Sequence, residues 1–63
     1  MKNYSELKAA VARANTPKEK TGTFVTGLLD IAVANKNNPQ AIQQFVDEVR
    51  ENQTSLIHDL TTV

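Results

Sequence analysis

The residues of this chain best suited to chemistry lie near its C-terminal end. His58 is the single histidine, with Asp59 beside it and Ser55 one helical turn before it. Serine, histidine and a carboxylate make up a hydrolytic triad, but neighbouring turns of one exposed helix provide neither an oxyanion site nor a pocket that excludes water. Glu51, one turn further back, adds a carboxylate without changing this. We therefore expect no enzymatic activity and no catalytic residue.

Metal and cofactor sites are also disfavoured by composition. The chain has no cysteine and one histidine. A zinc ion in a protein is usually bound by about four ligands, most of which are protein side chains. The lack of cysteine agrees with a reducing cytosol, and no apolar run approaches the roughly 20 residues of a membrane span. We expect no metal, no cofactor, no membrane contact and a cytoplasmic location.

Three cationic residues surround the start of a predicted helix and suggest a binding site. Lys18 and Lys20 lie beside the free backbone N–H groups of that start, and Arg13 is close through the preceding turn. Helix starts of this kind attract phosphate and other anions. Glu19 competes for the same N–H groups, and no glycine-rich loop is present. Arg13, Lys18 and Lys20 are the candidate residues for binding a nucleotide-like small molecule or nucleic acid.

The charge of the chain is zero overall but unevenly placed. Residues 1–20 carry five lysines and arginines against two glutamates, and residues 37–63 carry one arginine against four acids. Such a chain can pair its two ends, within one subunit or between subunits, or meet an anionic partner. A DNA-binding helix-turn-helix over Leu7 to Gly27 does not fit, because Asn15 and Lys20 fall where apolar residues belong.

The first of three predicted helices runs from about Tyr4 to Ala14. Asn3, followed by Glu6 three residues later, resembles a capping box. The apolar residues of this segment fall at helical spacing and form one narrow stripe, which consists of Tyr4, Leu7, Val11 and Ala14. The predicted helix is short and amphipathic.

The second predicted helix has the clearest ends. Thr16 is its N-cap, Pro17 takes the first helical position, and Asn37 can adopt the left-handed conformation that ends a helix. Apolar residues cover far more than a third of its circumference, which indicates burial on more than one side. They are Phe24, Val25, Leu28, Leu29, Ile31, Ala32 and Val33.

Two glycines, Gly22 and Gly27, raise a question about this helix, because each costs about 1 kcal/mol relative to alanine in a helix interior. Close packing offers one answer, since the pairs Gly22 with Thr26 and Thr23 with Gly27 would let another backbone approach. The other answer is an extended strand across this stretch. A helix is favoured, because the chain has no second strand signal with which a strand would pair.

The third predicted helix runs from Pro39 to about Leu60, opened by Asn38 as its cap. Five polar residues at 51–55 offer an alternative, in which the helix kinks or restarts with Asn52 or Thr54 as a new cap. The predicted helix carries an apolar seam at alternating steps of four and three, a heptad pattern. Its members are Ile42, Val46, Val49, Gln53, Leu56, Leu60 and Val63.

Chain length indicates how these helices assemble. A single domain of 63 residues is close to the lower limit for folding alone, and without disulfides or metal the remaining stabilising device is association. We predict an all-α single domain, residues 1–63, with the second and third helices in an antiparallel hairpin across the Asn35–Asn38 turn and a short N-terminal helix, assembling as a homo-oligomer. The predicted oligomer interface consists of Phe24, Leu28, Ile31, Val49, Leu56 and Leu60.

These patterns favour a non-catalytic, small helical interaction protein, a regulator, adaptor or inhibitor that acts as a homo-oligomer through apolar helix surfaces. Its expected partners are copies of itself and a partner protein. The alternative is a binder of an anionic small molecule or nucleic acid through the basic start of the second helix.

Overall fold

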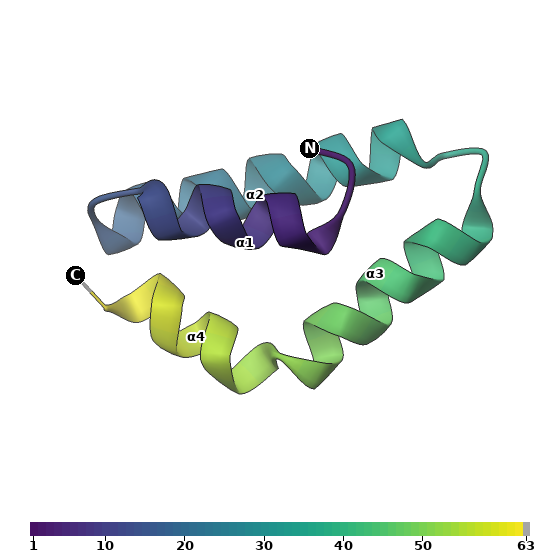
Figure 1. Ribbon diagram of the computed structural model, residues 1–63. Coiled ribbons are helices and arrows are strands. Elements are labelled where there is room, and N and C mark those ends of the chain that lie inside the picture. Colours follow the sequence, from purple (N-terminus) through teal and green to yellow (C-terminus); the bar gives the residue numbers. More distant parts are fainter. Residues whose placement is uncertain (63) are drawn as a thin grey trace.

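A computed structural model describes residues 1–62, which form four α-helices and no strand (Figure 1). α1 spans Tyr4–Arg13, α2 spans Pro17–Ala34, α3 spans Pro39–Glu51 and α4 spans Gln53–Thr61. The all-α prediction is confirmed for this part of the chain. Within it, no helix is both long enough and apolar enough to cross a lipid bilayer.

The predicted helix starts are found at the expected residues. Asn3, Thr16 and Asn38 each accept a hydrogen bond, through the side-chain oxygen, from the backbone N–H three residues further on, at 3.0, 3.2 and 3.2 Å. Glu6 completes the capping box of α1, because its Oε2 accepts a hydrogen bond of 2.7 Å from the backbone N–H of Lys2. Local capping chemistry therefore sets where three of the helices begin.

The chain is arranged as one helical pair with two further helices folded beneath it. α1 and α2 lie side by side and antiparallel, and α3 turns away from α2 before α4 comes back toward it (Figure 1). The predicted hairpin of the second and third helices is not the main packing seen, because α2 lies against α1 and α4, whereas α3 contacts α1 and α4.

A continuous third helix from Pro39 to Leu60 is wrong, and the restart at Asn52 is confirmed. Asn52 has φ −109° and ψ 13°, outside α3 and α4, and its Nδ2 donates a hydrogen bond of 2.8 Å to the carbonyl oxygen of Glu48. The same carbonyl oxygen accepts a hydrogen bond of 3.1 Å from the backbone N–H of Asn52, so Asn52 caps the end of α3 through both its backbone and its side chain. The predicted seam is thereby split between two helices, and its last member, Val63, lies outside the described residues.

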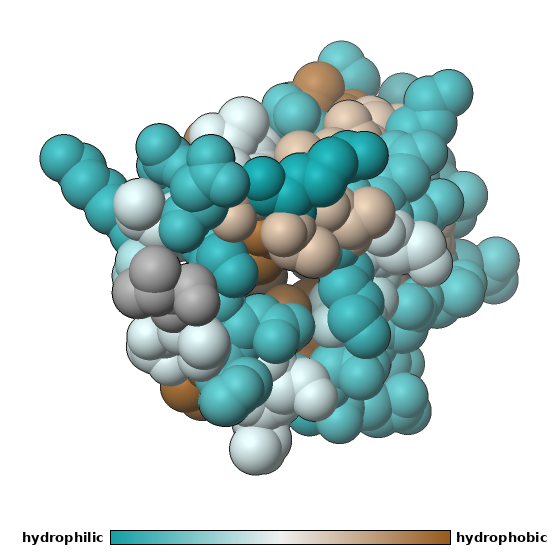
Figure 2. Space-filling view, turned by 60° about the vertical axis from the view of Figure 1, so that its left-hand side comes forward, coloured by the Kyte–Doolittle hydropathy of each residue, from teal (hydrophilic) through white to brown (hydrophobic). Residues whose placement is uncertain are grey.

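The core is built mainly by α1 and α2. Leu7, Val11 and Ile31 are fully buried and packed together, and Leu56 of α4 is buried as well. In Figure 2 hydrophobic atoms are visible in the middle of one face, beneath largely hydrophilic side chains. Other side chains pack partly buried against this cluster: Met1, Phe24, Leu28, Phe45 and Leu60.

The stretch from Gly22 to Gly27 is helical, so the strand alternative is wrong. Gly27 is buried beneath α1. A Cβ atom placed on Gly27 would overlap the Cδ1 atom of Leu7 and would lie 2.9 Å from the sulfur of Met1. The absence of a side chain at Gly27 thus allows the side chain of Leu7 to pack closely against α2. The close-packing hypothesis predicts the approach of another backbone, whereas the atoms nearest to Gly27 belong to side chains.

Candidate interaction surface

The outer face of α2 carries apolar side chains that the rest of residues 1–62 does not cover. Val25, Leu29 and Val33 are 50%, 64% and 68% exposed. They are spaced four residues apart and therefore form one continuous stripe along the helix, which we call the outer stripe. Ala32, also exposed, lies beside it. Single exposed apolar residues are ordinary on a protein surface, whereas a contiguous stripe is a candidate binding surface.

The opposite face of α2 is the one that packs against the rest of the chain. Ile31 and Gly27 are buried there, and Phe24 and Leu28 are partly buried against the core. The wide apolar arc of α2 is therefore divided into a buried part and an exposed part. One part of it builds the core, and the outer stripe remains open.

An open depression of about 500 Å³ lies next to the outer stripe. Its lining is mostly small, with Gly22, Thr23 and Thr26 from α2 and with Glu19 and Met1 at its borders. A Cβ atom placed on Gly22 would meet nothing within 4 Å from outside its own stretch of helix. The missing side chain at Gly22 therefore contributes free space to the depression and serves no packing within the subunit.

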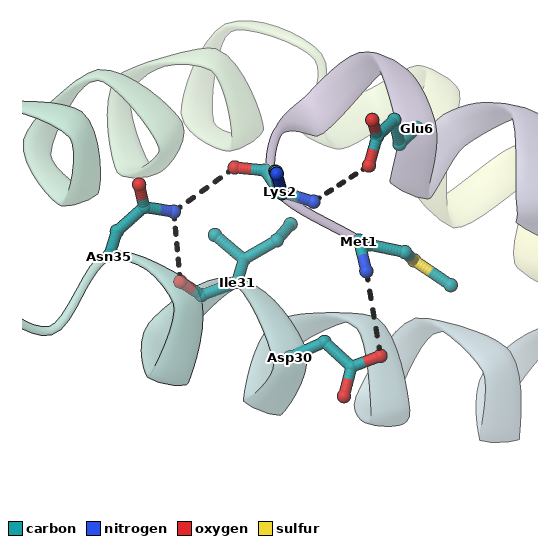
Figure 3. A network of polar contacts seen from close by, with 6 residues as sticks. All are labelled: Met1, Lys2, Glu6, Asp30, Ile31 and Asn35. Carbon is teal, nitrogen blue, oxygen red and sulfur yellow. Dashed lines mark hydrogen bonds and ion pairs between the residues drawn. The ribbon is translucent and has the colours of Figure 1, made fainter.

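The N-terminal residues are tied to α2 by a polar network (Figure 3). Asn35 Nδ2 donates hydrogen bonds of 3.0 Å to the backbone carbonyl oxygens of Lys2 and Ile31. The terminal ammonium group of Met1 lies 3.8 Å from Asp30 Oδ2, a half-exposed ion pair. These contacts hold the first residues along α2, and with them Met1, which borders the depression.

The six residues predicted to form the oligomer interface all lie away from the outer stripe. Ile31 and Leu56 are 1% and 4% exposed, inside the core of the subunit. The other four are partly buried; Phe24, Leu28 and Leu60 pack against the core cluster, and Val49 lies on α3. Val25, Leu29 and Val33 belong to the apolar arc predicted from sequence, but not to the predicted interface. Their spacing of four was the available signal.

The cationic candidates surround a helix start whose donors are largely in use. Arg13 and Lys18 are exposed, and Lys20 is partly buried. The backbone N–H of Glu19 donates to Thr16 Oγ1, and that of Lys20 donates to the carbonyl oxygen of Thr16 at 2.8 Å. Pro17, at the first position, has no N–H to offer. The free donors that would attract an anion are therefore few.

Tyr4 is the one buried side chain among the described residues with an unpaired polar atom. It is 6% exposed, and its hydroxyl has no hydrogen-bond partner. Burial raises the pKa of Tyr4, and the negative charges of Asp59 and Glu48 raise it further. Tyr4 also borders a second cavity of about 260 Å³ between the chain start and α3. The hydroxyl oxygen itself has almost no accessible surface, so it is not offered to a ligand in that cavity.

The C-terminal serine, histidine and aspartate considered for chemistry lie on α4, away from both cavities. Ser55 and His58 are exposed on α4 and Asp59 is partly buried, and none of them borders either of the two cavities described above. Within residues 1–62 no group of three or more histidine, cysteine, aspartate or glutamate side chains is placed to hold a metal ion.

Comparison with protein families, with curated proteins and with solved structures finds no match to this chain. Its function is therefore inferred from the residues of this chain alone.

Proposed function

We propose that this chain is a non-catalytic helical interaction protein, in the class of small regulators, adaptors and inhibitors, that binds a partner protein through the outer stripe of α2. The observation that carries the proposal is the exposure of Val25, Leu29 and Val33 on one helix face. Complete burial of one such side chain is worth roughly 1.5–3 kcal/mol. A partner that covers the stripe would therefore gain substantial binding free energy.

The form of the stripe indicates the mode of binding. Apolar anchors spaced four residues apart on a helix are the arrangement with which a helix fits a groove or packs against a second helix. α2 is held in place by α1 and α4 on its other side, so its outer face is already shaped before the partner arrives. Little ordering of the backbone would accompany binding, which favours affinity.

A capture experiment with a matched control tests the proposal. The full chain, Leu29→Lys and Ala12→Lys are immobilised separately and exposed to the proteins of the producing cell. Ala12→Lys introduces the same charge at an exposed position of α1. We expect partner proteins to bind the unaltered chain and Ala12→Lys, and to be lost from Leu29→Lys. Equal capture by all three would contradict the proposal, provided that circular dichroism shows the same helix content.

A further inference from the structure

We propose that the partner of α2 is a second copy of the same chain, packed antiparallel along the outer face of α2 about a two-fold axis. This inference rests on the proposed function, because it uses the outer stripe, and it adds the identity and orientation of the partner. A two-fold contact is self-complementary, so each feature of the surface must lie opposite its match on the same surface. An antiparallel register that places Gly22 of one copy opposite Val33 of the other meets this requirement.

Gly22 is the first observation behind this register. Glycine in a helix interior costs about 1 kcal/mol. At Gly27 the close packing of Leu7 offsets this cost, whereas at Gly22 no neighbour occupies the space and no positive φ requires glycine. The residue leaves a gap in the outer face of α2. A side chain from another molecule would fill that gap, and the outer stripe provides side chains of suitable size.

The spacing of the outer face supplies the apolar match. In an antiparallel pair, a step of four residues back along one helix is a step of four residues forward along the other. When Val33 of one copy lies opposite Gly22 of the other, Leu29 therefore lies opposite Thr26. Two large exposed side chains are thereby placed over Gly22 and Thr26, two of the three small residues that line the depression. All four residues lie within about 60° of the helix circumference, given 3.6 residues per turn.

The same register also matches charge. It places Glu19, at the border of the depression, opposite Lys36, which follows the end of α2 by two residues. Both residues are exposed, and the long lysine side chain can approach the carboxylate without displacing the capping bond that Glu19 accepts from the backbone of Asn15. Size and charge are therefore both compatible with this alignment, in which the two-fold axis lies at the level between Gly27 and Leu28 along α2.

The size of the contact sets the expected affinity. α2 has 18 residues and is therefore about 27 Å long. One face of one helix is smaller than the roughly 800 Å² that each partner buries in a standard stable interface. We therefore expect weak, reversible pairing that increases with protein concentration.

Cysteine cross-linking tests the orientation, and the chain is suited to it because it contains no cysteine. Gly22→Cys and Val33→Cys are prepared with different mass tags, mixed and oxidised. Antiparallel pairing predicts that mixed disulfides exceed the random share several-fold. Dominant Gly22→Cys or Val33→Cys homodimers would show parallel packing and overturn the inference. Ala9→Cys, at an exposed position of α1, should give only random cross-linking.

Charge reversal provides a second test that does not alter the apolar contact. In sedimentation at millimolar concentration and low salt, Lys36→Glu should reduce the dimer fraction several-fold, and adding Glu19→Lys in the same chain should restore it. A reversal without effect, or an unaltered chain that stays monomeric, would overturn the inference. The proposed function would survive that outcome if Leu29→Lys still lost a captured partner protein. It would fail if Leu29→Lys retained every partner.

Discussion

Gly22 and Gly27 lie five residues apart in the same helix, yet the structure gives them opposite surroundings. Gly27 is buried, and Leu7 occupies the space that a side chain would need. Gly22 borders a depression, and a Cβ atom placed on it would meet no atom within 4 Å from outside its own stretch of helix. The two faces of α2 therefore differ in how far the rest of the chain covers them. The inner face is completed by α1, whereas the outer face has the features of a packing surface without its partner.

The strongest test of this difference uses two leucines. Leu7→Ala should destabilise the subunit by about 2–5 kcal/mol, because it leaves a cavity at a fully buried position. Leu29→Ala should change the free energy of unfolding by no more than about 0.5 kcal/mol, since Leu29 is mostly exposed. Thermal unfolding at low protein concentration measures both. Equal losses would show that the outer face belongs to the core of the subunit.

The glycines provide the next test, with opposite signs expected. Gly27→Ala gains about 1 kcal/mol of helix propensity but overpacks against Leu7, at a cost of about 1–3 kcal/mol, so we expect net destabilisation. Gly22→Ala gains the same propensity without a clash and should stabilise the subunit by up to about 1 kcal/mol. Urea unfolding below the association range checks this. Stabilisation by both substitutions would remove the distinction between the faces.

A smaller effect is expected at the end of α2. Asn35→Ala removes two hydrogen bonds to backbone carbonyl oxygens, one of them from the N-terminal segment. We expect a loss of about 1 kcal/mol, the usual net value of such bonds, and faster amide exchange in the first residues. Asn37→Ala, two residues further along and exposed, is the control and should be near neutral. If amide exchange at the N-terminal segment did not change, its attachment through Asn35 would be disproved.

The smallest effect at neutral pH concerns Tyr4. Its hydroxyl is buried without a partner, so Tyr4→Phe should be neutral or slightly stabilising. The pKa of Tyr4 is raised in the folded state, chiefly by burial. The corresponding stability is fully present below the unfolded pKa of about 10 and is lost as pH rises through the folded value. Tyr4→Phe should therefore unfold less in alkaline titration. An unchanged alkaline midpoint would contradict this.

The parts of the fold that could be predicted from sequence are those set by local chemistry. Asn3, Thr16 and Asn38 begin helices because each side chain reaches a backbone N–H three residues away. The packing partner of α2 could not be predicted in the same way, because it depends on contacts between distant residues. Leu7 of α1 packs against Gly27 of α2, and neither residue alone indicates that the other is its neighbour.

The candidate surface could likewise be predicted from sequence only in part. The apolar arc of α2 was evident from spacing, but its division into an inner and an outer part required knowledge of where α1 lies. Ile31 and Val33 are both β-branched and apolar, yet they are 1% and 68% exposed. The cationic start of α2 stays a prediction as a binding site, and the structure adds that the backbone N–H groups of Asn15 and Glu19 already donate to the side chains of Glu19 and Thr16.

The bend at Asn52 decides which side of the molecule the last helix occupies. Without it, the nine residues of α4 would continue the axis of α3 for about 13 Å. α4, which carries the buried Leu56, would then lose its contacts with the first two helices. The closed shape of this small protein therefore depends on a single joint, and straightening that joint would turn a compact subunit into an open one with a detached arm.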